Sequence, residues 1–203
     1  MTDQMQTLKD DLAFLRGLTE DSGAGFAREA VIMIGVGVIF GIVDLLYWLG
    51  FSGWLPVPRQ VGAWFWVAGL VVFFVSMPIA RRRLPAPTGA AARAMAAAWS
   101  GIGISLTAAG IGLLLGAWRM GLPNLVLWVF PIVLFTLYGA AWGVAWAAKR
   151  TAWFALAALG CFAAAVAEGA LMGDAGQWLV SSLGLFVLVA VPGFAIMRAA
   201  RAA

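Results

Sequence analysis

The chain has 203 residues, of which 64% are hydrophobic and only 11% are charged. Soluble domains are typically about a quarter charged, so this composition excludes an ordinary water-exposed globular protein and favours lipid surroundings. The formal net charge of +4 comes from basic residues beside apolar stretches, where they can contact anionic headgroups. We therefore expect a lipid bilayer, and no nucleic acid, as the partner of this chain.

Residues 1–29 form a polar segment with an amphipathic pattern. Between Asp3 and Leu18, apolar residues recur at spacings of three and four, which predicts one apolar stripe on a helix. The stripe consists of Met5, Leu8, Leu12, Leu15 and Leu18. Its polar face is net acidic, whereas helices that lie on a membrane are usually basic. We therefore expect a cytoplasmic helix that packs against the protein's own loops, a second copy or a partner protein.

Six long apolar stretches follow this segment. A membrane-spanning helix needs about 20 mostly apolar residues, and each stretch reaches that length. The stretches are apolar all round rather than alternating like the strands of a membrane barrel, so we expect helices. They cover residues 30–51, 61–80, 94–118, 125–148, 152–172 and 177–197. The predicted fold class is an all-α integral membrane protein, with a six-helix transmembrane bundle over residues 30–203 and no cleaved signal peptide before it.

The last four stretches share a pattern that suggests two related hairpins. Ala98-Trp99 opens the third stretch and Ala152-Trp153 opens the fifth, while Met120-Gly121 and Met172-Gly173 end them. Repeated hairpins occur in transporters and also in structural bundles. We expect three helical hairpins, of which the first two stretches form a diverged copy.

Basic residues divide unequally between the two sides of the predicted membrane. Eleven of the thirteen fall on the side of the N-terminus: Lys9, Arg16, Arg28, Arg81, Arg82, Arg83, Arg93, Lys149, Arg150, Arg198 and Arg201. Only Arg59 and Arg119 fall on the other side. Cytoplasmic loops of membrane proteins carry an excess of Lys and Arg. We therefore expect a multi-pass protein of a bacterial inner (cytoplasmic) membrane with both termini in the cytoplasm.

Pairs of glycines four residues apart occur in the first, third and fourth stretches. They are Gly37 and Gly41, Gly112 and Gly116, and Gly139 and Gly143. Small residues let helices approach closely in lipid. We expect these glycines to pack helices together, within a homo-oligomer or a larger membrane complex.

Tryptophan is abundant, with 11 residues in the chain. Most of them lie near the ends of the apolar stretches, as expected for aromatic belts at the two membrane interfaces. An aromatic-lined pocket at the outer mouth, formed by Trp64, Phe65 and Trp66, is the alternative interpretation of part of this pattern.

Three ionisable residues lie within the stretches, toward their outer ends: Asp44, Arg119 and Glu168. Each follows a small residue by three positions, which places both on one helix face, turned toward the bundle interior. Ionisable side chains are costly in a membrane and often functional. We therefore expect an interior polar cluster that binds a polar or cationic solute or relays protons. The structural alternative is that Arg119 and Glu168 reach the interface and that Asp44 is paired, protonated or hydrogen-bonded.

Several chemistries are excluded or unsupported. Histidine is absent, which excludes His-ligated haem and most zinc and copper sites. The single cysteine, Cys161, excludes an intrachain disulfide and is expected to be a small packed side chain. The sequence contains no phosphate-binding loop, zinc-protease motif or nucleophile elbow. We therefore expect a protein that is not an enzyme and that holds no cofactor or metal.

The leading interpretation is a non-enzymatic membrane protein that acts as an accessory, regulatory or assembly component. It would work through helix–helix contacts and its N-terminal helix. The alternative is a small solute transporter or channel with a polar site around Asp44. Hydroxyl side chains are scarce within the stretches, which favours the accessory role because a transport pathway needs polar lining.

Overall fold

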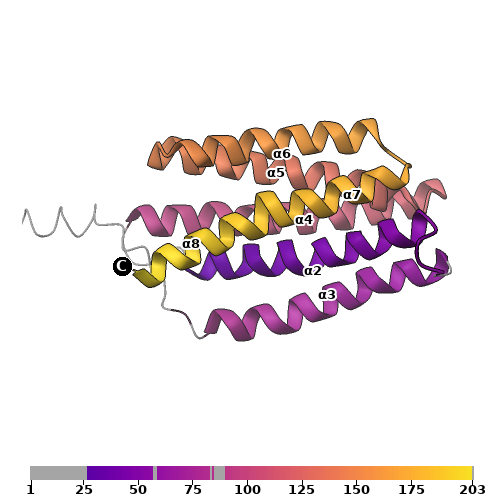
Figure 1. Ribbon diagram of the computed structural model, residues 1–203, viewed down its shortest axis with the longest axis horizontal. Coiled ribbons are helices and arrows are strands. Elements are labelled where there is room, and N and C mark those ends of the chain that lie inside the picture. Colours follow the sequence, from indigo (N-terminus) through magenta and orange to yellow (C-terminus); the bar gives the residue numbers. More distant parts are fainter. Residues whose placement is uncertain (1–26, 57–58, 83, 85–89, 203) are drawn as a thin grey trace, which may run out of the picture.

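The structure, a computed structural model, describes residues 27–56, 59–82, 84 and 90–202, and their regular secondary structure is helical. The elements are α2 (Ala27–Phe51), α3 (Arg59–Arg82), α4 (Ala90–Met120), α5 (Leu125–Lys149), α6 (Ala152–Ala170), α7 (Ala175–Gly184), the π-helix η2 (Leu185–Ala190) and α8 (Val191–Ala202). The last three continue one another as a single rod (Figure 1). The predicted N-terminal helix and its stripe lie outside the described residues.

Six helices of the described chain are long and apolar enough to cross a membrane, counting the rod from α7 to α8 as one. The prediction of an all-helical protein with six long apolar helices is therefore confirmed. By length and composition, these six helices indicate a multi-pass membrane protein.

The helices run side by side along the long axis of the molecule (Figure 1). Helix α2 contacts α3 on one side and α7, η2 and α8 on the other, while α6 contacts both α5 and the rod. Helix α4 packs against α5. Only 6% of the apolar membrane-crossing segment of α3 is buried, and the same is true of α4. The core therefore lies between α2, α5, α6 and the rod.

Short turns reverse the chain at both ends of the bundle. Gly121 after α4 and Gly173 after α6 adopt positive φ angles of 66° and 86°, and Arg150 between α5 and α6 adopts a φ of 52°. A left-handed residue at a helix C-terminus ends the helix by satisfying its last carbonyl groups. The Arg150 amide accordingly donates to the Trp146 carbonyl oxygen at 2.7 Å. These turns hold consecutive helices close together.

The closest approach in the core is between α2 and the rod. A Cβ atom added to Gly37 would lie 2.5 Å from the Ala190 backbone nitrogen and 2.6 Å from the Leu185 carbonyl oxygen. A Cβ atom at Gly41 would lie 3.0 Å from the Phe186 ring. Glycine is therefore required at Gly37, because the backbone of η2 occupies the space that a side chain would fill.

The π-helix lies directly before Pro192, which cannot donate a backbone hydrogen bond to the Leu188 carbonyl oxygen one turn earlier. The indole nitrogen of Trp142 on α5 donates to that oxygen instead, at 3.2 Å. A proline in a membrane helix is tolerated where a neighbour satisfies the backbone group that it leaves free. Trp142 is fully buried, so this bond ties α5 to the rod in the middle of the core.

The other predicted glycine contacts differ among themselves. Gly139 on α5 faces the Phe162 ring of α6, at 2.8 Å from an added Cβ atom. By contrast, an added Cβ atom at Gly112 or Gly143 would meet no atom of the described residues within 4 Å, and at Gly116 only the Met120 methyl at 3.9 Å. Within the described chain, Gly112, Gly116 and Gly143 therefore lie on open helix faces, so that their role in helix packing stays a prediction for contacts with a second copy or another protein.

We expect Gly37→Ala to destabilise the protein by about 1–3 kcal/mol, because the new methyl group overpacks the contact with the η2 backbone. Thermal denaturation of the purified protein in mild detergent measures the effect. Gly112→Ala is the matched control and should be neutral or stabilise α4 by about 0.5–1 kcal/mol, because alanine favours a helix over glycine. Equal effects of the two substitutions would contradict the close approach at Gly37.

Candidate functional site

Buried polar side chains gather on α2, α6 and α7, near the end of the bundle opposite the C-terminus. Asp44 lies about two turns before the end of α2, and Glu168 lies in the final turn of α6. The members of this polar cluster, with their exposed fractions, are Asp44 (0%), Glu168 (0%), Gln177 (0%), Ser181 (2%) and Ser182 (1%). The surrounding bundle is apolar, so these side chains depend on one another and on nearby backbone groups for hydrogen bonds.

Two serines tie α7 to α2. The Ser181 hydroxyl donates to Oδ2 of Asp44 at 2.6 Å, and the neighbouring Ser182 hydroxyl donates to the Gly41 carbonyl oxygen at 2.8 Å. Gly41 precedes Asp44 by almost one turn, so the two bonds lie along the same contact between the helices. The second carboxyl oxygen of Asp44, Oδ1, is buried and has no hydrogen-bond partner among the described residues.

Gln177 links α7 to the elements on its other side. Its amide oxygen accepts from the Gly173 backbone nitrogen at 3.1 Å, and its amide nitrogen donates to the Trp128 carbonyl oxygen at 2.8 Å. Both ends of the amide are therefore engaged with backbone groups. The side chain also interacts electrostatically with Glu168, although it forms no hydrogen bond to it in the geometry described.

Glu168 is the least satisfied member of the cluster. Both of its carboxyl oxygens are buried without a hydrogen-bond partner in the part of the chain that the structure describes. Glu168 and Asp44 are close enough to interact electrostatically. Burying a carboxyl group without partners is costly, so the arrangement favours a ligand that satisfies the oxygens of both acids.

An aromatic pair lies beside the carboxyl group of Asp44. Tyr47 on α2 and Trp178 on α7 contact each other with their ring centroids 4.4 Å apart and their planes tilted by 38°. Both are buried. Since Tyr47 follows Asp44 by three positions and Trp178 precedes Ser181 by three, each ring lies on the same helix face as its polar neighbour. The pair separates the carboxyl groups from the water at this end.

Asp44 and Glu168 are both buried near the same end of the bundle, whereas Arg119 is not buried. Arg119 is exposed at the C-terminal end of α4, a helix that packs against α5. Its placement in the cluster is therefore corrected, because α4 lies on the flank of the bundle and its end does not turn toward the core. Sequence reasoning missed Gln177, Ser181 and Ser182. The signal that could have identified them is that they are polar side chains in an otherwise apolar stretch.

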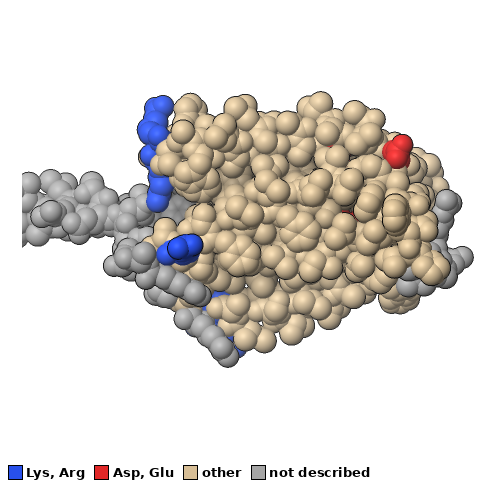
Figure 2. Space-filling view, in the orientation of Figure 1, with Lys and Arg blue, Asp and Glu red and all other residues tan. Residues whose placement is uncertain are grey.

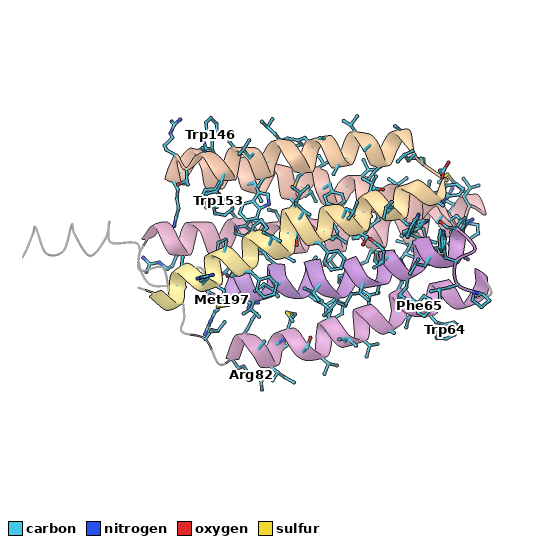
Figure 3. All side chains as sticks on the ribbon, in the orientation of Figure 1. Trp64, Phe65, Arg82, Trp146, Trp153 and Met197 are labelled. Atoms are coloured by element: carbon cyan, nitrogen blue, oxygen red, sulfur yellow. The ribbon has the colours of Figure 1, made fainter. Side chains whose placement is uncertain are left out.

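The expected aromatic pocket at Trp64, Phe65 and Trp66 is also not formed by these three side chains together. Trp64 is 68% exposed, while Trp66 packs on Phe40 of α2 with ring centroids 5.4 Å apart. In Figure 3, Trp64 and Phe65 lie near one end of the bundle, and Trp146 and Trp153 lie near the other, where Arg82 also lies. This distribution fits rings placed at two membrane interfaces.

The cluster can bind a proton or a small cation, because its free groups are carboxyl oxygens. Within the described ranges, no group of three or more His, Cys, Asp or Glu side chains is placed to hold a metal ion. Cys161 is buried in the core between α5 and α6, away from the cluster.

Comparisons of this chain with protein-family models, with curated proteins and with solved structures found no match.

Proposed function

We propose that the protein spans a bacterial inner membrane six times as three hairpins, with both termini in the cytoplasm. The support is the distribution of charge. Helices α3 and α5 carry basic residues in their last turns, Arg81 and Arg82 in α3 and Lys149 in α5, and these turns lie at the end of the bundle where the chain ends (Figure 1). Figure 2 shows Lys and Arg gathered at that end, with acidic atoms at the opposite end. An excess of Lys and Arg is typical of the cytoplasmic side.

Reporter fusions test this orientation. We expect a reporter that is active only in the cytoplasm to function when fused after residue 203, and a periplasmic reporter to function when inserted at Gly173. The reason is that the two positions lie at opposite ends of the bundle and only the first is flanked by basic residues. The reversed pattern of activity would contradict the proposed topology.

We propose further that the protein is a small, non-enzymatic transporter that handles a proton or a small cation at the site formed by Asp44 and Glu168. The observation that carries this proposal is the group of three buried carboxyl oxygens that have no hydrogen-bond partner among the described residues. They are Oδ1 of Asp44 and Oε1 and Oε2 of Glu168. Intramembrane carboxyl groups are costly and commonly mark ion and proton pathways.

The position of Arg119 supports the transport proposal over the accessory role that composition favoured. A guanidinium group inside the cluster would have formed an ion pair with the acids. In that case the acids would have had a purely structural role. Arg119 is exposed instead, so it does not provide that partner. The serines and Gln177 add further polar groups beside the two acids.

Flux measurements in proteoliposomes test the transport function. We expect the wild-type protein to dissipate an imposed proton or monovalent-cation gradient faster than empty vesicles, and Asp44→Asn or Glu168→Gln to reduce that rate to the background. Both substitutions keep the size of the side chain and remove the ability to carry a charge. A dye that reports internal pH or cation concentration gives the rate.

Two exposed charges supply matched controls for the flux experiment. Arg119→Gln and Asp174→Asn should leave the rate unchanged, because both residues lie outside the cluster on the surface. A wild-type rate equal to that of empty vesicles, or an Asp44→Asn rate equal to the wild type, would contradict the proposed function.

A second candidate function is the accessory role in an oligomer or larger membrane complex. It is favoured by the two flanking helices, since α3 and α4 expose large side chains such as Phe74, Ile104 and Trp118. Those faces can contact lipid or another protein. We expect mild-detergent purification of the tagged protein to yield a stoichiometric partner that is lost on deletion of residues 1–21. Recovery of the chain alone, with and without that segment, would argue against this role.

A further inference from the structure

We infer that the ligand of the carboxyl site is a proton bound at Asp44 or Glu168, and not a metal cation. This inference rests on the proposed function, because it names which of the small cations that site takes. It follows from the charge balance of the buried cluster, from the number of oxygens available and from the hydrogen bond that links the cluster to α7.

Charge balance excludes two ionised carboxylates at this position. Asp44 and Glu168 are both 0% exposed and interact electrostatically. Removing an ionised carboxylate from water costs several kcal/mol unless a partner compensates it, and two like charges in a low-dielectric interior repel strongly. One bound proton removes one of the two charges.

The groups that face the pair provide no compensating positive charge in the described part of the chain. On α2 the nearest titratable neighbour is Tyr47, which contacts Trp178. At the start of α7, Asp174 is exposed and accepts from the Gly176 backbone nitrogen. Helix α5 carries Tyr138, which packs on Trp99, and it carries Lys149 at the far end of the bundle.

Basic residues of α3 and α4 are the other candidates for a compensating charge. Arg119 is exposed on α4, and on α3 the basic residues Arg81 and Arg82 lie in its last turn, at the opposite end. The Arg59 side chain at the start of α3 lies outside the described residues, so the experiment below includes it.

The oxygens available are too few for a metal ion. Hard cations such as Ca²⁺ take six to eight oxygen ligands, and Mg²⁺ needs a near-ideal octahedron. The cluster offers the three free carboxyl oxygens, whereas the Gln177 and Gly41 oxygens already accept hydrogen bonds at 3.1 and 2.8 Å. Full burial leaves no access for water to complete a coordination shell. A proton needs only one oxygen to bind and a second to accept.

The Ser181 hydroxyl keeps α2 and α7 together in both protonation states. A hydroxyl group can donate one hydrogen bond and accept others. It donates to Oδ2 of Asp44 at 2.6 Å in this structure, which stabilises the ionised form, and it can accept from a protonated Asp44 by rotating its own hydrogen. The proton can therefore move on and off the pair without breaking the contact between the two helices.

The test is the melting temperature of the purified full-length protein in detergent, measured from mildly acidic to alkaline pH. All proteins carry Glu29→Gln, because Glu29 is another buried carboxyl group of the described chain. If the folded state holds one proton that the unfolded state releases, the melting temperature should fall by roughly 3–5 °C per pH unit as pH rises. The double variant Asp44→Asn, Glu168→Gln should abolish that slope, whereas the control Asp174→Asn should retain it.

Three results would overturn the inference. The first is a wild-type slope that the double variant retains. The second is saturable stabilisation by Na⁺, K⁺, Ca²⁺ or Mg²⁺ at fixed pH that the double variant loses, which would assign a metal cation. The third is loss of folding in Arg59→Gln that the double variant restores, which would show that the acids are ionised and paired with Arg59.

A second measurement keeps the inference testable if the double variant does not fold. Infrared spectroscopy of the protein with Glu29→Gln should show a protonated carboxyl band at neutral pH that disappears at alkaline pH, and its absence at neutral pH would contradict a bound proton. These outcomes are separate from the flux experiment. A metal-dependent melting temperature leaves transport of a cation standing, while a proton on the pair without any flux removes the transport function alone.

Discussion

The close approach of α2 to the last helix is the contact on which the rest of the structure depends. Gly37 lets the η2 backbone lie where a side chain would otherwise stand, and this approach brings the serines of α7 within hydrogen-bonding distance of α2. In lipid, helices gain little from burying apolar surface, so close packing and interhelical hydrogen bonds must hold them together. Both kinds of interaction occur along this one contact.

The polar cluster and the π-helix lie on the same rod, and both interrupt an otherwise regular apolar bundle. Pro192 frees the Leu188 carbonyl oxygen, and Trp142 satisfies it. One to two turns away, Asp44 and Glu168 keep three oxygens unsatisfied. Among the described residues, Glu29, Trp66, Ser76 and Trp99 also carry a buried polar atom without a hydrogen-bond partner. The polar cluster differs from them because it holds three such carboxyl oxygens, and this concentration supports the functional proposal. π-Helical turns also occur often near functional sites.

Sequence reasoning identified the two acids but not the complete cluster. Asp44 and Glu168 could be recognised because a carboxyl group in an apolar helix is conspicuous and costly. Arg119 met the same criteria of depth and spacing, yet α4 packs against α5 on the flank and leaves Arg119 exposed. Gln177 and the two serines were not recognised as members of the cluster. Uncharged polar residues are common in helices, and the sequence alone does not show which residues lie beside them.

The sequence by itself determined the helical fold and its length scale, because about 20 apolar residues in lipid can satisfy their backbone only as a helix. It also identified the residues able to carry charge. Only the tertiary structure decided which helix faces meet, since Gly37 and Gly112 have the same local pattern but only Gly37 lies against another backbone. The tertiary structure also decided that Asp44 and Glu168, which come from helices distant in the chain, are buried in one polar cluster. This arrangement depends on how α2, α6 and α7 pack.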